Sequence, residues 1–217
     1  MPDESFKDRT DAGRELARGL DAYAGQPDVI VLGLPRGGVP VAYEVAEELG
    51  APLDVFLVRK LGVPGHEEFA MGAIASGGVR VLDPEVVRML GIDDGTVEAV
   101  AAAEKMELER RERVYRHDRP VPDLRDQTVI VIDDGLATGS TMKAAVRAIR
   151  AQHPKKLVVA VPVAARETCE DLRTEVDELV CSRTPEPFRA VGLWYEDFAQ
   201  TTDDEVRSLL ARASKAE

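Results

Sequence analysis

The stretch VIVIDDGLATGST, residues 129–141, determines the fold and the site that we expect in this 217-residue chain. Four apolar residues predict a buried strand, which delivers Asp133 and Asp134 to its carboxyl end. A tight turn from Gly135 to Ser140 then opens a helix. In open α/β sheets ligands bind beyond the carboxyl ends of the strands, so this segment predicts a ligand site.

The start of that helix has the features of a phosphate-binding loop. The backbone amides from Ala137 to Thr141 can converge on one phosphate at a helix N-terminus. Thr138, Ser140 and Thr141 add hydroxyl donors, and Gly139 lets the backbone approach closely. Two carboxylates beside such a loop suit a sugar phosphate, because the acids can face hydroxyls or a metal ion. The alternative is an acidic turn that caps an ordinary helix.

Apolar runs and helical periods alternate along the rest of the chain. We expect further strands at 29–34, 53–60, 79–82, 157–165 and 177–183. We expect helices at 11–23, 39–50, 93–117 and 139–152, and another from Asp203. This alternation predicts a single α/β domain over residues 1–217, with a mainly parallel twisted sheet flanked by helices.

Two segments stand apart from this alternation. The stretch 61–78 contains five glycines and a proline and fits neither period, so it predicts a long mobile loop. The helix at 93–117 is highly charged, with Asp93 or Asp94 as its N-cap. The pair Glu107 and Arg111 has the i, i+4 spacing that supports a solvated helix.

Composition narrows the class of protein. Lys and Arg number 28 against 40 Asp and Glu, and this net charge of −12 argues against a nucleic-acid partner. Cys169 and Cys181 have no metal-binding spacing and indicate reduced thiols. No leader and no apolar run long enough to span a bilayer is found, so we expect a cytoplasmic protein without a membrane partner.

The segment 129–141 resembles the signature of the type I phosphoribosyltransferases, which use phosphoribosyl pyrophosphate (PRPP): four apolar residues, two acids, then ATG-small-T. The resemblance implies transfer of 5-phosphoribose from PRPP to a nitrogenous base, with release of pyrophosphate and with Mg2+ as cofactor. Asp133 and Asp134 match the catalytic acids that contact the ribose hydroxyls and help place the metal. Ala137 to Thr141 match the loop that holds the 5′-phosphate. In chain order the resemblance extends over residues 29–165.

GLPRGGVP, residues 33–40, follows the first strand, where this family has its pyrophosphate loop. It is not a Walker loop, because Val39 stands where that loop has Lys. Arg36 offers a charged fork for pyrophosphate and for catalysis, and Gly37 exposes backbone amides. Family members often have a cis or strained peptide here. The alternative is a plain turn.

Arg59 and Lys60 end the second expected strand and resemble the family's basic residues near pyrophosphate. The alternative is a solvated strand end. The loop 61–78 occupies the position of the family's flexible catalytic loop. In it Glu67, or Glu68, is the candidate general base, and the alternative is an exposed loop acid.

The tail from about 184 to 217, with the N-terminal arm, matches the hood that covers the base in this family. Trp194 or Tyr195 would stack on the base, and the alternative is that both belong to a small core. The hypoxanthine-guanine branch has an acid where Ala137 stands, whereas the adenine and orotate branches have Ala. An orotate site needs cations for the substrate carboxylate, and only Arg189 lies near Trp194 in sequence, so a purine is favoured.

The fifth expected strand ends in VPVAAR and lacks the lysine by which the hypoxanthine-guanine branch reads its purine, which leaves backbone groups or Arg166. Another class of function remains open, a PRPP-binding regulator without catalysis. A phosphatase of the haloacid dehalogenase type is disfavoured, because Asp133-Asp134-Gly135 does not supply D-x-D-x-T. The family is often dimeric, which allows a homodimer, although the charged helix offers no clear seam.

Overall fold

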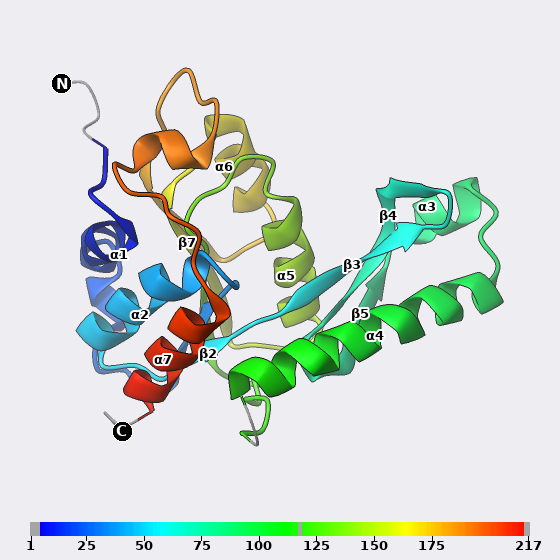
Figure 1. Cartoon of the computed structure of the whole chain (residues 1–217), viewed down its shortest axis with the longest axis horizontal. Helices are drawn as coiled ribbons and strands as arrows, with labels where there is room; N and C mark the ends of the chain where they lie inside the picture. The colour runs from blue at the N-terminus through cyan, green and yellow to red at the C-terminus, as the bar shows by residue number, and fades with distance from the viewer. Residues whose placement is uncertain (1–4, 117–118, 215–217) are drawn as a thin grey trace.

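The computed structural model describes residues 5–116 and 119–214, without the side chains of Glu67 and Glu68. These residues form a body, built around a parallel sheet, and an arm that projects from it (Figure 1). The arm consists of an antiparallel sheet backed by one long helix. In the described parts of the chain, no helix is long and apolar enough to cross a membrane.

Five parallel strands form the sheet of the body in the order β2-β1-β6-β7-β8. Their bounds are β1 Val29–Gly33, β2 Leu53–Val55, β6 Thr128–Ile132, β7 Lys156–Val163 and β8 Glu178–Arg183. Strands β1 and β6 are buried at every position, which explains why they are apolar runs without alternation. The predicted α/β fold with a mainly parallel sheet is therefore confirmed.

Helices cover both faces of this sheet. On one face lie α1 Arg9–Arg18, α2 Gly38–Leu49 and α7 Asp203–Ala213, with the short η1 Asp21–Tyr23. On the other face lie α5 Ser140–Arg150 and α6 Arg166–Arg173. Gly50 ends α2 at a φ of 62°, in the left-handed region that glycine tolerates best.

The arm begins where the chain leaves the body after β2. Its strands β3 Val58–Val63, β4 His66–Ala75 and β5 Val79–Leu82 pair antiparallel, and η2 Ser76–Gly78 joins the last two. The short α3 Pro84–Met89 follows, and α4 Asp94–Arg116 runs back along the sheet towards the body (Figure 1). Leu61 and Met71 of the sheet and Leu108 of α4 are buried in one apolar cluster, so the arm has a core.

The prediction of a long mobile loop at 61–78 is wrong, because this stretch forms most of the arm's sheet. Its glycines serve the sheet. Gly65 turns the chain between β3 and β4 with a φ of +78°. At Gly72 a Cβ atom would lie 2.3 Å from the carbonyl oxygen of Val81, so glycine lets β4 and β5 approach closely.

The predicted strand 53–60 is in fact two strands in two different sheets. Phe56 donates its amide to the carbonyl of Gly33 in the body, at 3.0 Å. The next amide, of Leu57, donates to Oγ of Ser76 in the arm, also at 3.0 Å. Arg59 and Lys60 therefore belong to the arm, as does the predicted strand 79–82.

Arg116 fastens the end of α4 to the body. Its side chain is only 2% exposed. Its Nε donates to both carboxylate oxygens of Asp54 at 3.1 Å, Nη1 donates to Glu112 at 2.9 Å, and Nη2 donates to the carbonyl of Val55. This buried network joins the arm's long helix to β2.

A small aromatic cluster, which we call the hood cluster, lies over the end of β7. It is formed by Phe6, Ala12, Val163, Phe188, Val191, Trp194, Tyr195 and Phe198. The N-terminal segment takes part directly, since Phe6 donates its amide to the carbonyl of Trp194 at 2.9 Å. The turn η3 Val191–Trp194 belongs to the cluster, whereas α7 packs separately against α2 and α4.

Candidate active site

Strand β6 ends in the acid pair, and both carboxyls are partly buried. Oδ1 of Asp133 accepts the amide of Asp134 at 2.9 Å. Burial raises the pKa of Asp133 well above its ordinary value, and the Asp134 carboxylate raises it further. Burial also raises the pKa of Asp134, although Arg9 opposes the rise. Two carboxyls with raised pKa values favour protons, cations or hydroxyl groups beside them.

Arg9, which the sequence did not single out, holds the second acid from α1. Its Nε and Nη2 donate to Oδ2 of Asp134 at 2.9 and 2.8 Å. Its Nη1 donates to the carbonyl of Ala199 at 2.7 Å, and the guanidinium lies 4.1 Å from the ring centre of Phe198. Arg9 therefore ties the N-terminal helix, the tail and the acid pair together.

The PRGG turn lies directly against the acid pair. A Cβ at Gly37 would lie 2.0 Å from Oδ2 of Asp134, and one at Gly38 would lie 2.8 Å from Cα of Asp133. Only residues without a Cβ fit this close approach. The peptide bond between Pro35 and Arg36 is cis.

The turn 135–139 leaves the start of α5 open. Gly139 has a φ of +66°, and a Cβ there would lie 2.6 Å from Cγ2 of Thr168. Thr168 also donates its hydroxyl to the carbonyl of Ala137 at 2.5 Å, which steadies the turn from α6. The hydroxyls of Thr138 and Ser140 lie 3.1 Å apart. No described side chain caps the N-terminus of α5, so its first amides are available to an anion.

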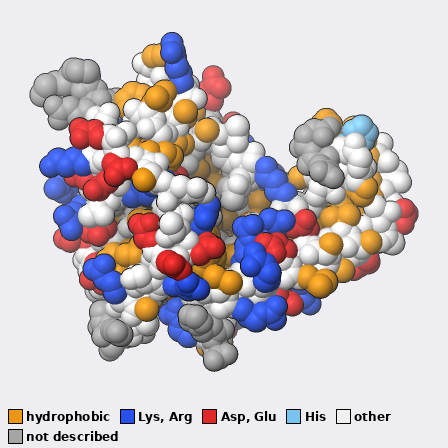
Figure 2. Space-filling model, viewed as in Figure 1, with side chains coloured by type: hydrophobic (Ala, Val, Ile, Leu, Met, Phe, Trp, Pro, Cys, Tyr) orange, Lys and Arg blue, Asp and Glu red, His pale blue; other side chains and the backbone are white. Residues whose placement is uncertain are grey.

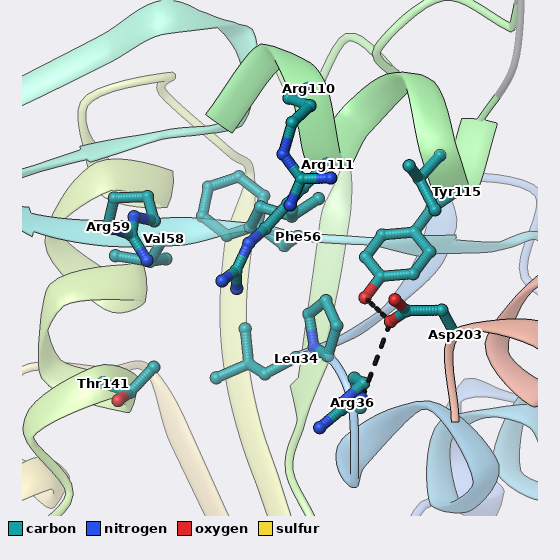
Figure 3. A pocket seen from close by; sticks show the side chains of 13 residues that line it. Leu34, Arg36, Phe56, Val58, Arg59, Arg110, Arg111, Tyr115, Thr141 and Asp203 are labelled. Atoms are coloured by element: carbon teal, nitrogen blue, oxygen red, sulfur yellow. Dashed lines mark hydrogen bonds and ion pairs between the residues drawn. The ribbon is translucent and has the colours of Figure 1, made fainter. Parts of the chain in front are cut away.

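A pocket of about 280 Å³ opens where the body meets the arm (Figure 3). It is lined by Leu34, Pro35, Arg36, Phe56, Leu57, Val58, Arg59, Arg110, Arg111, Val114, Tyr115, Thr141 and Asp203. Four of these side chains are arginines and one is a carboxylate, although the whole chain has a net charge of −12. Because Thr141 and Arg36 share this pocket, the turn at α5 and the PRGG turn face the same space.

Arg59 and Lys60 point to opposite sides of β3, as neighbours on a strand do. Arg59 lines the pocket with Arg36 and is paired with Glu104 at 2.6 Å. Lys60 lines a second pocket of about 280 Å³, shared with Ser140 at the start of α5. The predicted basic pair is thus divided between two spaces.

The remaining predicted residues lie in two places. The backbone of Glu67 is near the tip of the arm, seven positions before Ile74, the strand partner of Arg59. At ~3.3 Å per residue this is roughly 23 Å from the pocket, so the structure does not bring Glu67 to the acid pair, and its side chain lies outside the description. Tyr195 is buried and donates its hydroxyl to the carbonyl of Asp134 at 2.6 Å, while Trp194 is half-buried beside it.

Sequence reasoning missed Arg9, Arg110, Arg111, Tyr115 and Asp203. Tyr115 donates its hydroxyl to Oδ1 of Asp203 at 2.6 Å, and burial raises the pKa of Tyr115 to about 12. These groups meet across long stretches of chain, which no local pattern reveals. One signal was present in the sequence, since Arg111 and Tyr115 have the i, i+4 spacing of one helix face.

Comparison with known proteins identifies the family. A model of the phosphoribosyl transferase domain matches residues 4–192. Two proteins from strains CDC 1551 and H37Rv of Mycobacterium tuberculosis, each named "Putative phosphoribosyl transferase", are 48% identical over 210 residues. The match covers 97% of this chain and 47% of each relative, so the chain spans about half the length of these curated relatives.

Two further proteins resemble this chain, one over nearly its whole length and the other over about half of it. The crystal structure of TT1426 from Thermus thermophilus has a TM-score of 0.87 and 44% identity, covering 96% of this chain and 98% of that one. The bifunctional protein PyrR of Chloroflexus aurantiacus is 34% identical over 116 residues, 52% of this chain and 58% of its own length. Because the family model matches residues 4–192, which is most of this chain, the chain belongs to the phosphoribosyl transferase family.

Proposed function

We propose that this protein transfers 5-phosphoribose from PRPP to a nitrogenous base, with a purine favoured, and releases pyrophosphate. One observation carries the proposal. Gly37 and Gly38 touch the acid pair so closely that no Cβ fits, while the PRGG turn shares a pocket with Thr141. Groups suited to a diphosphate, a ribose and a 5′-phosphate therefore meet at one edge of the sheet.

Each part of PRPP has a matching set of groups. The open amides of α5 and the hydroxyls of Thr138, Ser140 and Thr141 suit the 5′-phosphate. Lys60 borders the same helix start and would add a cation there rather than at the diphosphate. Asp133 and Asp134 suit the ribose hydroxyls, which can donate hydrogen bonds to carboxylates.

The acid pair also fits Mg2+, provided that the substrate completes the coordination. Burial raises the pKa of both carboxyls, and a cation beside them would stabilise their ionised forms. Among the described residues no group of three or more acidic, histidine or cysteine side chains could hold a metal alone. Mg2+ is commonly bound by one or two carboxylates together with substrate phosphates, and there it would neutralise charge on the departing diphosphate.

The reaction is a displacement at C1 of the ribose. The bond from C1 to the diphosphate oxygen breaks, and its electron pair leaves with the diphosphate. A ring nitrogen of the base bonds to C1 and gives up its proton. Arg36 and Arg59 would stabilise the negative charge that develops on the leaving group. Glu67 remains a proposal as general base, and it requires the tip of the arm to approach the body.

The cations near the hood cluster favour an uncharged acceptor. Arg9 already holds Asp134, Arg166 holds Glu186 at 2.5 Å, and Arg183 holds Glu15. A base with a carboxylate, such as orotate, would have to displace one of these acids or rely on the exposed Arg189. A neutral purine needs only a stacking surface, which we assign to Trp194, because Tyr195 packs between Phe6 and Phe198.

Pyrophosphate release from PRPP and Mg2+ across a panel of bases tests this function. Release is expected with adenine or another purine, and not in an Asp133→Asn/Asp134→Asn control. Turnover with orotate or uracil alone would contradict the choice of a purine. Binding of PRPP without release by any base would favour the alternative, a non-catalytic regulator. The two free cysteines suit a reducing compartment, so we propose the cytoplasm, and we leave a homodimer as a proposal.

A further inference from the structure

We propose that Arg110 and Arg111 of α4 bind the diphosphate of PRPP together with Arg36 and Arg59, and that Glu107 holds these two helix arginines when the diphosphate is absent. This inference rests on the proposed function. It assigns two of the four leaving-group arginines to α4, a helix of the arm, rather than to a loop. The two residues precede Val114 and Tyr115 on the same helix face, which lines the pocket.

Four arginines from three segments surround one pocket. Arg36 comes from the PRGG turn, Arg59 from β3, and Arg110 and Arg111 from α4. Figure 3 shows the side chains of Arg59 and Arg111 extending into the space between α4 and Thr141. Asp203 is the only carboxylate that lines the pocket among the described residues, and it already accepts the hydroxyl of Tyr115.

The charge and size of the pocket indicate a small polyanion. Its lining charges, four arginines and one aspartate, sum to +3, although the chain as a whole carries −12. Glu104 and Glu107, which pair with three of these arginines, bring the local sum to +1. Four guanidinium groups around a volume of about 280 Å³ suit a compact group with several oxygens, since guanidinium groups bind phosphates through paired hydrogen bonds. The net charge of −12 on the whole chain would oppose the approach of an extended nucleic acid.

Glu107 supplies a substitute anion for the two helix arginines. Arg110 donates to both of its carboxylate oxygens, at 2.7 and 3.0 Å, and Arg111 donates to Oε1 at 2.8 Å. These hydrogen bonds lower the pKa of Glu107 to about 2, so it is ionised in the working range of pH. The arginine side chains are 59% and 45% exposed, which leaves them free to exchange Glu107 for a diphosphate.

Calorimetry with inorganic pyrophosphate, at fixed Mg2+, tests the proposal. The Arg110→Gln/Arg111→Gln variant is expected to bind pyrophosphate at least about 10-fold more weakly than the unaltered protein. Its affinity for ribose 5-phosphate, which has no diphosphate, should change less than about 2-fold. Arg113→Gln is the matched control, because Arg113 lies on α4 but outside this pocket. Glu107→Gln should bind pyrophosphate as tightly as the unaltered protein or more tightly.

The outcomes separate this inference from the proposed function. Equal pyrophosphate affinity in the double variant and in the Arg113→Gln control would overturn the role of the helix arginines. Weaker binding in Glu107→Gln would overturn the role of Glu107. If the unaltered protein binds PRPP and releases pyrophosphate with a base while the double variant behaves normally, only the inference fails. If the unaltered protein binds neither PRPP nor pyrophosphate, the proposed function fails.

Discussion

The body and the arm contribute different halves of the candidate site. The body carries Asp133, Asp134 and the turn at α5 within one short stretch of sequence, so local order alone brings them together. The arm contributes Arg59, Arg110 and Arg111, which meet only because α4 folds back along β3. Figure 2 shows a hollow between the two parts, with Lys and Arg side chains gathered near its lower edge. In the proposed reaction, the groups for the sugar phosphate are therefore close together in sequence, whereas those for the leaving group come together only through the tertiary fold.

The carboxyls of the two parts also differ in character. In the body, burial and a neighbouring acid raise the pKa of Asp133. In the arm, two arginines lower the pKa of Glu107. The body acids are therefore set to receive a cation or hydroxyl groups, whereas the arm arginines are set to receive an anion.

We expect the largest effect from a variant that removes the buried contact between α4 of the arm and β2 of the body. Arg116→Met should lower the free energy of unfolding by about 3–5 kcal/mol, because it leaves Asp54 buried without its cation. Urea unfolding measures this loss. Arg113→Met, an exposed position on the same helix, should change stability by less than about 0.5 kcal/mol. A similar small change in both variants would mean that the buried ion pair does not couple the arm to the body.

A second expectation concerns order within the arm. Amides of residues 72–75 should exchange hydrogen roughly 100-fold more slowly than those of the turn at 64–65, because this part of β4 is paired on both sides. Hydrogen exchange followed by mass spectrometry, with β6 as the reference strand, measures this ratio in the ligand-free protein. Fast exchange throughout 61–78 would support the mobile loop that the sequence predicted.

A smaller effect is expected in the titration of the two carboxyls, Asp133 and Glu107. In a carbon-detected NMR titration Asp133 should titrate above its ordinary value of 3.8, and Glu107 at about 2. The raised pKa means that Asp133 contributes stability at low pH that is lost as pH rises through its folded value. Glu107, with a lowered pKa, contributes stability that is lost as pH falls towards 2.

The variants Asp133→Asn and Glu107→Gln test the opposite pKa shifts through the pH dependence of the free energy of unfolding. Relative to the unaltered protein, Asp133→Asn should gain stability as pH rises, and Glu107→Gln should lose it. Urea unfolding between about pH 3 and 8 follows both trends. If the stability of both variants, relative to the unaltered protein, changes with pH in the same direction, the pKa values of Asp133 and Glu107 are not shifted in opposite directions.

The sequence predicted the body well, for physical reasons. Strands such as β6 are buried on both faces, so their apolar runs are unbroken, and the acids and glycines that follow are contiguous. It failed at 61–78, because glycines that serve a turn at Gly65 and a close strand contact at Gly72 look like loop residues. A one-dimensional pattern does not distinguish these uses.

The missed site residues depend on contacts between distant parts of the chain. Arg9 meets Asp134 across 125 residues, and no local spacing indicates that pair. The pairing of Glu107 with Arg111 was predicted as support for a solvated helix and is confirmed. That Arg111 lies in the same pocket as Arg36 depends on how the arm folds against the body, which the sequence alone does not show.

Calorimetry of PRPP binding in the presence of Mg2+ tests whether the acid pair binds the ribose. Asp133→Asn/Asp134→Asn is expected to weaken binding by about 3 kcal/mol, because charged hydrogen bonds to the ribose and the metal are lost. Glu47→Gln/Glu48→Gln is the matched control, since it removes two adjacent, exposed acids from α2. PRPP affinity equal to the control in the Asp133 and Asp134 variant would contradict the central claim that this edge of the sheet binds the ribose of PRPP.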